Sequence, residues 1–429
     1  MAAEYKLSLP TAILININIM MGAGIFINTV ELSKRTGLLG GFMYPLIGLL
    51  VLPLIVAIAK LIKLYPSGGF YTYGEQISPL IGYISTWSYF IAKLASASLM
   101  IHVSVSLITQ ILPALLSIGS VLFYDLLILS SFICLNLLNM KTGSRIQFGF
   151  LALKLIPVLF VIVVGVLLLA PAHVFSLPVL WAGIPSSLPL VLYAAMGFEA
   201  ICAISNKIED AERNGPKAIM ISFSVMMILV FLFQFLFYAT LGQTLTDQAN
   251  YLGAFPALLQ KLFPASSALN HKLQALFHLA IASSALGGCY GILYSNNWNL
   301  HILAQNKKIR GWQILTTLNA QAIPYVCLFV EWLFCIVYLF ATAGNQVILQ
   351  QLAALGTTIA YTVCVIALFI AYKRHHYSFA QKLVPFTALI SCILLIGAVI
   401  RNFMIGGVLP LVGFCVLLLL GLFMYQKNT

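Results

Sequence analysis

Long apolar runs, each about as long as a bilayer is thick, follow one another along the chain with short polar breaks between them. A hydrocarbon core about 30 Å thick needs roughly 20 apolar residues per helix, and backbone groups inside it must be paired within the protein. The 429 residues are 62% hydrophobic and 7% charged, unlike a soluble domain. The sequence therefore predicts an all-α polytopic membrane protein with twelve spans, at about 11–33, 40–64, 80–110, 120–139, 146–170, 184–207, 216–242, 272–302, 319–341, 346–372, 384–401 and 405–426.

The net charge of +12 is explained by topology and needs no acidic partner. With the N-terminus in the cytoplasm, fifteen of the 22 Lys and Arg residues fall on the cytoplasmic side, five fall outside, and two, Lys93 and Lys154, lie within spans. Basic residues accumulate on the cytoplasmic side of membrane proteins. We therefore expect a multi-pass protein of the plasma membrane, the inner membrane of the cell, with both termini cytoplasmic and no nucleic-acid partner.

Nothing in the remaining residues indicates a signal peptide, a metal or a cofactor. The first apolar run has no small-residue cleavage site and continues the pattern of the later spans. Eight cysteines are scattered through apolar runs without CxxC spacing, which indicates small buried side chains. A metal site of His301, His375 and His376 is conceivable, but that spacing is not diagnostic, and we expect no metal and no cofactor.

The first apolar run contains a stretch poorly suited to an unbroken helix, ININIMMGAGIFINTV at 15–30. Gly22 and Gly24 each lower helix stability by up to about 1 kcal/mol. Unwound backbone in a membrane is tolerated only where it lines a protected cavity or meets a ligand. A break here would present N–H groups and the positive end of a half-helix to an anion, and carbonyl groups to a cation.

The sixth predicted span has a second weak point, YAAMGFE at 193–199, where Gly197 precedes Glu199. Interrupted helices in corresponding positions are typical of inverted-repeat transporters. Close helix packing explains any single glycine equally well, whereas the pair favours a transporter. We expect a transporter core at 1–372, with five-helix repeats at about 11–170 and 184–372, and two further transmembrane helices at 373–429.

Four motifs occur in order along the chain: GAGIF (22–26), PSGGFYTYGEQISPLIGYISTW (66–87), GFEA (197–200) and KIEDAERNGPKAI (207–219). Together they resemble the amino acid–polyamine–organocation transporters, a family of amino acid permeases and exchangers. The resemblance implies the five-plus-five fold with broken helices 1 and 6, two extra C-terminal helices, and an amino acid held between the breaks. Near the end of span 8 the chain departs from the family, since Asn299 and His301 stand where an arginine region is usual.

Carried over residue by residue, the resemblance gives both charges of an amino acid a place at the breaks. Ala23 and Gly24 would offer backbone N–H groups to the substrate carboxylate. The carbonyl groups of Ile19 and Met196 would accept hydrogen bonds from the ammonium group. Broken helices supply both complementary ends without a buried ion pair.

Side chains around the breaks suggest a gate but are compatible with more than one class of substrate. Tyr193, four residues before Gly197, matches an aromatic that family members place over the substrate, and is a candidate outer gate; plain packing is the alternative. Ile25 and its small neighbours permit a neutral substrate side chain, whereas Lys93 permits an acidic one.

Two ionisable residues in spans are candidates for coupling. Burial disfavours the charged form of a lysine, so Lys154 in span 5 could exchange a proton. Proton-coupled members of the family carry a matching lysine where sodium-coupled members place a cation, so the resemblance implies proton symport or sodium-independent exchange. The alternative is a lysine that snorkels to the cytoplasmic surface near Arg145. Glu199 is either a latch protonated during transport or an inert carboxylate satisfied by N–H groups.

Lys93 and Glu209 complete the coupling and gating candidates. Lys93 falls in span 3 near the expected cavity, where the family pattern has no lysine. It could pair with Asp125 or Glu331, or meet an acidic group on the substrate. Glu209 lies in the polar loop after span 6, which resembles a cytoplasmic family motif and is expected to hold an inner gate through weak exposed ion pairs, or to be a plain solvated loop.

We expect a secondary transporter of amino acids or related amines by alternating access, with proton symport favoured over exchange. Its partners would be the amino acid, protons or a counter-substrate, and the lipid bilayer; the oligomeric state is not readable. A membrane enzyme is disfavoured because no nucleophile–base pair, metal cluster or cofactor motif is present. A transport-inactive sensor or a channel of the same fold is the other alternative, though no charged ring indicates a filter. No ATP-binding motif occurs, so a gradient or counter-substrate should supply the energy.

Overall fold

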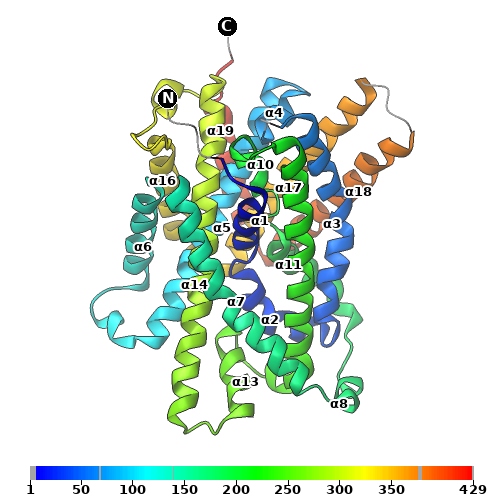
Figure 1. The fold of residues 1–429 in the computed structure, drawn as a ribbon, viewed down its shortest axis with the longest axis vertical. Helices are drawn as coiled ribbons and strands as arrows, with labels where there is room; N and C mark the ends of the chain where they lie inside the picture. The colour runs from blue at the N-terminus through cyan, green and yellow to red at the C-terminus, as the bar shows by residue number, and fades with distance from the viewer. Residues whose placement is uncertain (1–5, 67–68, 139, 375–378, 428–429) are drawn as a thin grey trace.

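This computed structural model describes residues 6–66, 69–138, 140–374 and 379–427, and its regular elements in these ranges are helices. Within these ranges, nine helices are long and apolar enough to cross a membrane, and a bent pair adds a tenth. Two shorter apolar helices, α6 (Val121–Asn136) and α19 (Leu409–Met424), bring the number to twelve. The predicted all-α polytopic fold is confirmed, and the helices follow the predicted spans in order (Figure 1).

The helices that make up the spans are α1 with α2 (Leu9–Met20, Gly24–Thr36), α3 (Leu39–Leu64), α5 (Pro79–Ile111), α6 (Val121–Asn136), α7 (Met140–Leu167), α9 with α10 (Ile184–Ala195, Ala200–Ile204), α11 (Ala211–Leu241), α14 (Ala268–Gln305), α16 (Tyr325–Thr342), α17 (Gln346–Arg374), α18 (Phe379–Gly406) and α19 (Leu409–Met424). Short helices in the connections are α4 (Phe70–Glu75), α8 (Pro171–Ser176), α12 (Gln243–Thr246), α13 (Ala254–Leu262) and α15 (Trp312–Leu315).

Serine residues in the polar breaks fix where several spans begin. The side chains of Ser78, Ser120 and Ser267 each accept a hydrogen bond from the backbone N–H three residues on, at the starts of α5, α6 and α14. Such caps satisfy N–H groups that the first turn of a helix leaves without partners. At α5, Pro79 follows directly and supplies a backbone angle already suited to a helix.

The interior of the bundle is formed by α5 and α14, which are buried on most sides. The outer helices α7, α16 and α18 keep most of their surface exposed, and their exposed side chains are large and apolar, as at Phe148, Phe340 and Phe386. Such a surface suits contact with lipid. The two central helices are therefore positioned to support a site inside the bundle.

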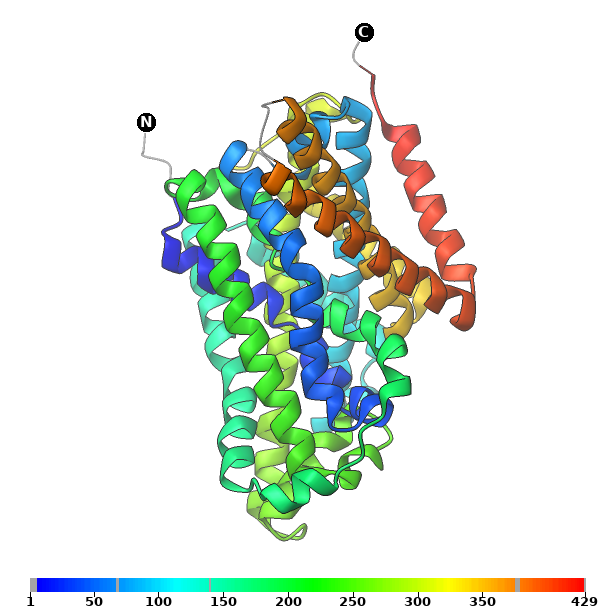
Figure 2. The ribbon, with the colours of Figure 1, turned by 90° about the vertical axis from the view of Figure 1, so that its right-hand side faces the viewer.

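Both termini lie at one end of the molecule, called here the terminal end, and α13 lies at the opposite, far end (Figure 1). The last helix, α19, runs along the periphery (Figure 2). The Trp87 indole N–H donates to the carbonyl of Leu417 at 2.9 Å, and the Tyr83 hydroxyl donates to that of Gly421 at 2.7 Å. These contacts join α19 to the central helix α5.

Candidate functional site

The first span is broken at its middle, as predicted. Helix α1 ends at Met20, α2 begins at Gly24, and the two axes differ by 45°. The N–H of Gly22 turns back to the carbonyl of Met20, and the N–H groups of Ala23 and Gly24 have no backbone acceptor in the described part of the chain. The start of α2 therefore presents free N–H groups and the positive end of its dipole.

The sixth span breaks at the same level. Helix α9 ends at Ala195, Gly197 has a φ of +115°, and α10 begins only at Ala200. A side chain is strained at that φ, and a Cβ on Gly197 would also lie 3.1 Å from the Cα of Met20. The two breaks thus lie against each other, and the glycine permits their close approach.

The asparagines of the first span cross-link the broken helices. Asn16 on α1 donates to the carbonyl of Phe198, within the break in span 6, at 3.1 Å. Asn28 on α2 donates to the carbonyl of Leu190 on α9 at 2.7 Å. Because both side chains are fully buried, these bonds hold each half of span 1 to the matching half of span 6.

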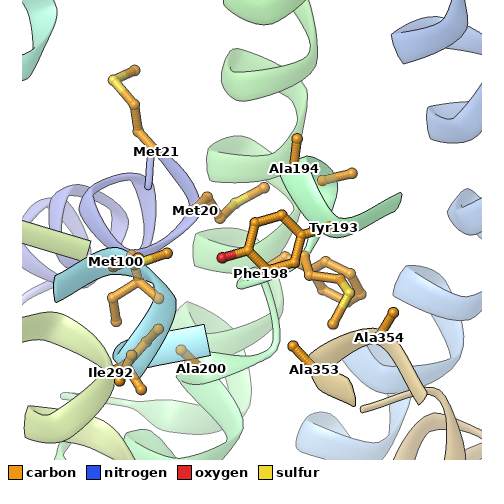
Figure 3. Packing of buried hydrophobic residues seen from close by; sticks show 14 of the residues in the cluster. Met20, Met21, Met100, Tyr193, Ala194, Phe198, Ala200, Ile292, Ala353 and Ala354 are labelled. Atoms are coloured by element: carbon orange, nitrogen blue, oxygen red, sulfur yellow. The ribbon is translucent and has the colours of Figure 1, made fainter. Parts of the chain in front are cut away.

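A small cavity of about 20 Å³ lies between the breaks. Five of the seven predicted substrate-binding residues line it: Ile19, Gly24, Tyr193, Met196 and Gly197. The predicted residues Ala23 and Ile25 are buried but do not line it. Since this volume holds about one water molecule, the site is closed, and side chains such as those in Figure 3 must move before an amino acid fits.

Helices α5, α14 and α17 supply cavity-lining side chains that the sequence did not single out. They are Ser96 and Met100 on α5, Ile292 on α14 and Ala353 on α17. The hydroxyl groups of Ser96 and Tyr193 lie 3.2 Å apart. Ser96 could have been found as the residue three positions after Lys93, on the same helical face.

A much larger cavity of about 440 Å³ opens toward the far end, next to the start of α17. Asn28, Leu190 and Gln350 line it, and Gln350 donates to Asn28 at 3.4 Å. These three residues lie one helical turn from Gly24, Ala194 and Ala353, which surround the closed cavity. One layer of side chains therefore separates the two cavities.

At the terminal end, the N-terminal segment pairs through its backbone with the loop after span 6. The N–H of Leu7 donates to the carbonyl of Lys207 at 2.8 Å, and the N–H of Glu209 donates to the carbonyl of Leu7 at 3.0 Å. Lys207 also lies over the Trp298 ring at 5.0 Å, which joins this loop to α14. Within the described residues the exposed carboxylate of Glu209 forms no ion pair, and its role at an inner gate stays a prediction.

Lys154 on α7 is fully buried and reaches the break in span 1. Its ammonium donates to the carbonyls of Asn18 at 2.8 Å and Met21 at 2.6 Å. The Ser284 hydroxyl also donates to Met21, at 3.2 Å. The alternative of a lysine that snorkels to the surface is therefore wrong, and Lys154 satisfies carbonyl groups that the unwound backbone exposes.

Lys93 lines the cavity and is ion-paired with Glu199, Nζ to Oε1 at 2.5 Å. The suggested partners Asp125 and Glu331 are wrong: Asp125 pairs with His102 at 2.8 Å, and Glu331 is buried on α16 and does not line the cavity. The sequence could not select among these carboxylates, because a long flexible lysine reaches several neighbouring helices.

Glu199 is fully buried and has further donors. The Tyr89 hydroxyl donates to its Oε1 at 3.1 Å, and the Gly197 N–H donates to its Oε2 at 2.9 Å. The carboxylate therefore ties the break of span 6 to the central helix α5. The expected hydrogen bond from the loosened backbone is present, from the N–H of Gly197, and the role of a latch stays a prediction.

The histidines suggested as a metal site are not brought together in the described residues. The Nδ1 of His301 lies 3.2 Å from the carbonyl of Leu315, and His375 and His376 lie outside the residues that the structure describes. Asn299 donates to Asn296 at 3.1 Å and is buried within α14. These span-8 residues therefore serve local packing.

Comparison with known proteins gives one family. The family described as amino acid permease matches residues 7–423, almost the whole chain. An amino-acid permease of Bacillus subtilis (strain 168), AapA, is 23% identical over 81% of this chain and 75% of its own length.

Two mammalian transporters match over shorter stretches. The human cystine/glutamate transporter is 26% identical over 67% of this chain and 57% of its own length. The mouse b(0,+)-type amino acid transporter 1 is 23% identical over 56% of this chain and 52% of its own length. The chain thus spans little more than half the length of these two relatives.

Proposed function

Because the chain belongs to the amino acid permease family, a family of multi-pass membrane transporters and not of enzymes, we propose that it carries its substrate by proton-coupled symport with alternating access. The contact between the two broken helices carries this proposal, since unwound backbone inside a membrane needs a ligand or a protected cavity. An amino acid carries a carboxylate group for the unpaired backbone N–H groups at the breaks and an ammonium group for the unpaired carbonyl groups.

The substrate carboxylate would bind the first turn of α2. The N–H groups of Ala23 and Gly24 have no backbone acceptor among the described residues, and the helix dipole favours an anion there. The ammonium group would bind the carbonyls of Ile19 and Met196, which accept no backbone hydrogen bond from outside their own helices in the same ranges. Ile25 and Gly197 would shape the site without donating a side-chain group.

Lys154 would couple transport to protons. Its ammonium donates hydrogen bonds to the carbonyl groups of Asn18 and Met21. Without the ammonium, a bound cation would be needed to satisfy these carbonyl groups of the unwound helix. Loss of the proton would weaken both bonds and free α1 to move relative to α7. The far side would load substrate and proton together, and the terminal side would release them.

The proposed gates would lie on the two sides of the closed cavity. Tyr193 would be the outer gate, because it lines the cavity and bonds to α5 through Ser96. On the terminal side, Lys93 with Glu199 would form the latch beneath the substrate, and the backbone of Glu209 would hold the N-terminal segment closed. Opening one group while the other stays closed gives alternating access.

The remaining architecture follows from the same proposal. Residues 1–372 would form the transporter core, with inverted repeats at about 11–170 and 184–372, and residues 373–429 would add two helices outside it. The terminal end would face the cytoplasm and the 440 Å³ cavity would face outward across the plasma membrane.

The test is uptake of radiolabelled amino acids by purified protein in liposomes, with and without an inward proton gradient and with unlabelled amino acid inside. Accumulation that requires the gradient supports symport. Uptake that requires internal amino acid, and not the gradient, identifies exchange instead. Absence of uptake for every amino acid by folded protein contradicts the proposed function.

A further inference from the structure

The charge of Lys93 lies in the part of the closed cavity that is left for the side chain of the substrate. Among the described residues that line the cavity, Lys93 alone is charged. Lys93 and Ser96 lie one turn apart on α5, with Ile292 on α14 and Ala353 on α17 around them. The breaks in spans 1 and 6 provide for the α-carboxylate and α-ammonium groups, so these helices surround the rest of the substrate.

The partners of Lys93 and Glu199 are unequal in number. Glu199 receives the Lys93 ammonium at 2.5 Å, the Tyr89 hydroxyl at 3.1 Å and the Gly197 N–H at 2.9 Å. In the described structure Lys93 has this single carboxylate, with the Tyr89 ring 5.2 Å from its nitrogen. If Glu199 takes a proton, it keeps a partner at each oxygen, whereas Lys93 becomes a buried cation without a counter-charge.

On the basis of the proposed transport function, we propose that the substrate is an amino acid with an acidic side chain, whose carboxylate replaces Glu199 as the partner of Lys93. Glu199 takes up one proton from the outer solution as the exchange occurs. The substrate adds one negative charge and the proton one positive charge, so the net charge of the cavity is unchanged. When the substrate leaves on the terminal side, Lys93 returns to Glu199 and the proton is released there.

Other classes of substrate fit these residues less well. A neutral side chain would leave the ion pair between Lys93 and Glu199 intact, so Lys93 would have no role in binding. Stability does not explain the buried lysine either, because a buried ion pair stabilises a protein no better than well-packed apolar residues do. A cationic side chain would place a like charge beside Lys93 in an environment of low dielectric constant. An acidic side chain gives the buried lysine a function.

Three other titratable groups face Glu199: Tyr89 on α5, Cys202 on α10 and Tyr361 on α17. Phenols and thiols are uncharged near neutral pH, so they do not supply the charge that Lys93 needs. Lys154 acts at another place, on the carbonyls of α1. At this site pH therefore acts through Glu199, and Lys93 connects it to the substrate.

The test is equilibrium binding of radiolabelled glutamate to the purified full chain, with glutamine and arginine as competitors. Wild-type protein is expected to bind glutamate on the order of tenfold more tightly than glutamine, and arginine more weakly than either. Over the range in which Glu199 takes up a proton with the ligand, the ratio of the Kd for glutamate to the Kd for glutamine should fall about tenfold per unit decrease in pH, because a proton on Lys154 would affect both ligands alike.

Variants separate the proposed role of Lys93 in substrate preference from the proposed role of Glu199 in pH dependence. Lys93→Gln should abolish the preference for glutamate, and the double variant Lys93→Gln/Glu199→Gln should do the same without leaving a buried carboxylate unpaired. Glu199→Gln should keep the preference and lose its pH dependence. Lys63→Gln, at an exposed lysine of α3, is the matched control and should behave as wild type.

The outcomes distinguish this proposal from the one on which it rests. Binding of glutamine as tight as that of glutamate, or an unchanged preference in both Lys93 variants, overturns the acidic-substrate proposal and leaves amino acid transport standing. Absence of binding of every amino acid overturns both.

Discussion

Replacing Lys154 with methionine removes the ammonium and keeps a side chain of similar length. Two charge-assisted hydrogen bonds are lost, at 2.8 Å to Asn18 and 2.6 Å to Met21. Met21 keeps the Ser284 hydroxyl, but the carbonyl of Asn18 loses its donor, because the N–H of Gly22 bonds to Met20. One buried acceptor without a partner lowers the free energy of unfolding by about 1–3 kcal/mol.

The assay is gradient-driven uptake in liposomes, with the melting temperature of the detergent-solubilised protein as a folding control. For each proton carried with the substrate, each pH unit of gradient is worth about 1.4 kcal/mol, or up to about tenfold accumulation. Wild-type protein and the exposed-lysine control Lys63→Met should show the stimulation carried by the proton on Lys154, and Lys154→Met should lose that part, about tenfold per pH unit. Folded Lys154→Met protein that responds to the gradient as wild type does would refute the assignment of Lys154 to coupling.

Three further predictions concern the breaks. A Cβ on Gly24 would lie 3.0 Å from the backbone of Ala194, so Gly24→Leu should abolish amino acid binding. Gly413→Leu, at a glycine with open space around it, is the control and should bind amino acid normally in the same assay. Retained affinity in Gly24→Leu would contradict the backbone site. Gly197→Ala forces a side chain into a φ of +115° and should cost about 1–3 kcal/mol, seen as a lower melting temperature; an unchanged value would show that the break relaxes. Tyr193→Ala should remove the proposed outer gate and raise the KM for uptake by about tenfold, and an unchanged KM would make the ring simple packing.

Much of the fold is readable from the sequence because the bilayer imposes strong local rules. Apolar length identifies a span, and a polar serine before it fixes the start, as at Ser120 of α6. The two breaks are also readable, because Gly24 and Gly197 weaken a helix where hydrocarbon would otherwise favour one. These features depend on neighbours along the chain.

The contacts around the breaks depend on neighbours in space and escape such reasoning. Asn16 carries an amide that several helices could bind, and only the packed bundle brings it to the carbonyl of Phe198. Lys93 likewise has several carboxylates within the reach of its side chain before packing selects Glu199. Glu209 carries a charge that indicates an ion pair, yet the contact it makes is through its backbone N–H, with the carbonyl of Leu7.

The most direct test of the account is an experimental structure with an amino acid bound. The account predicts the substrate between the broken helices, with its carboxylate at the N–H groups of Ala23 and Gly24 and its ammonium at the carbonyls of Ile19 and Met196. An amino acid bound elsewhere, for example in the 440 Å³ cavity with the two breaks unoccupied, would contradict it.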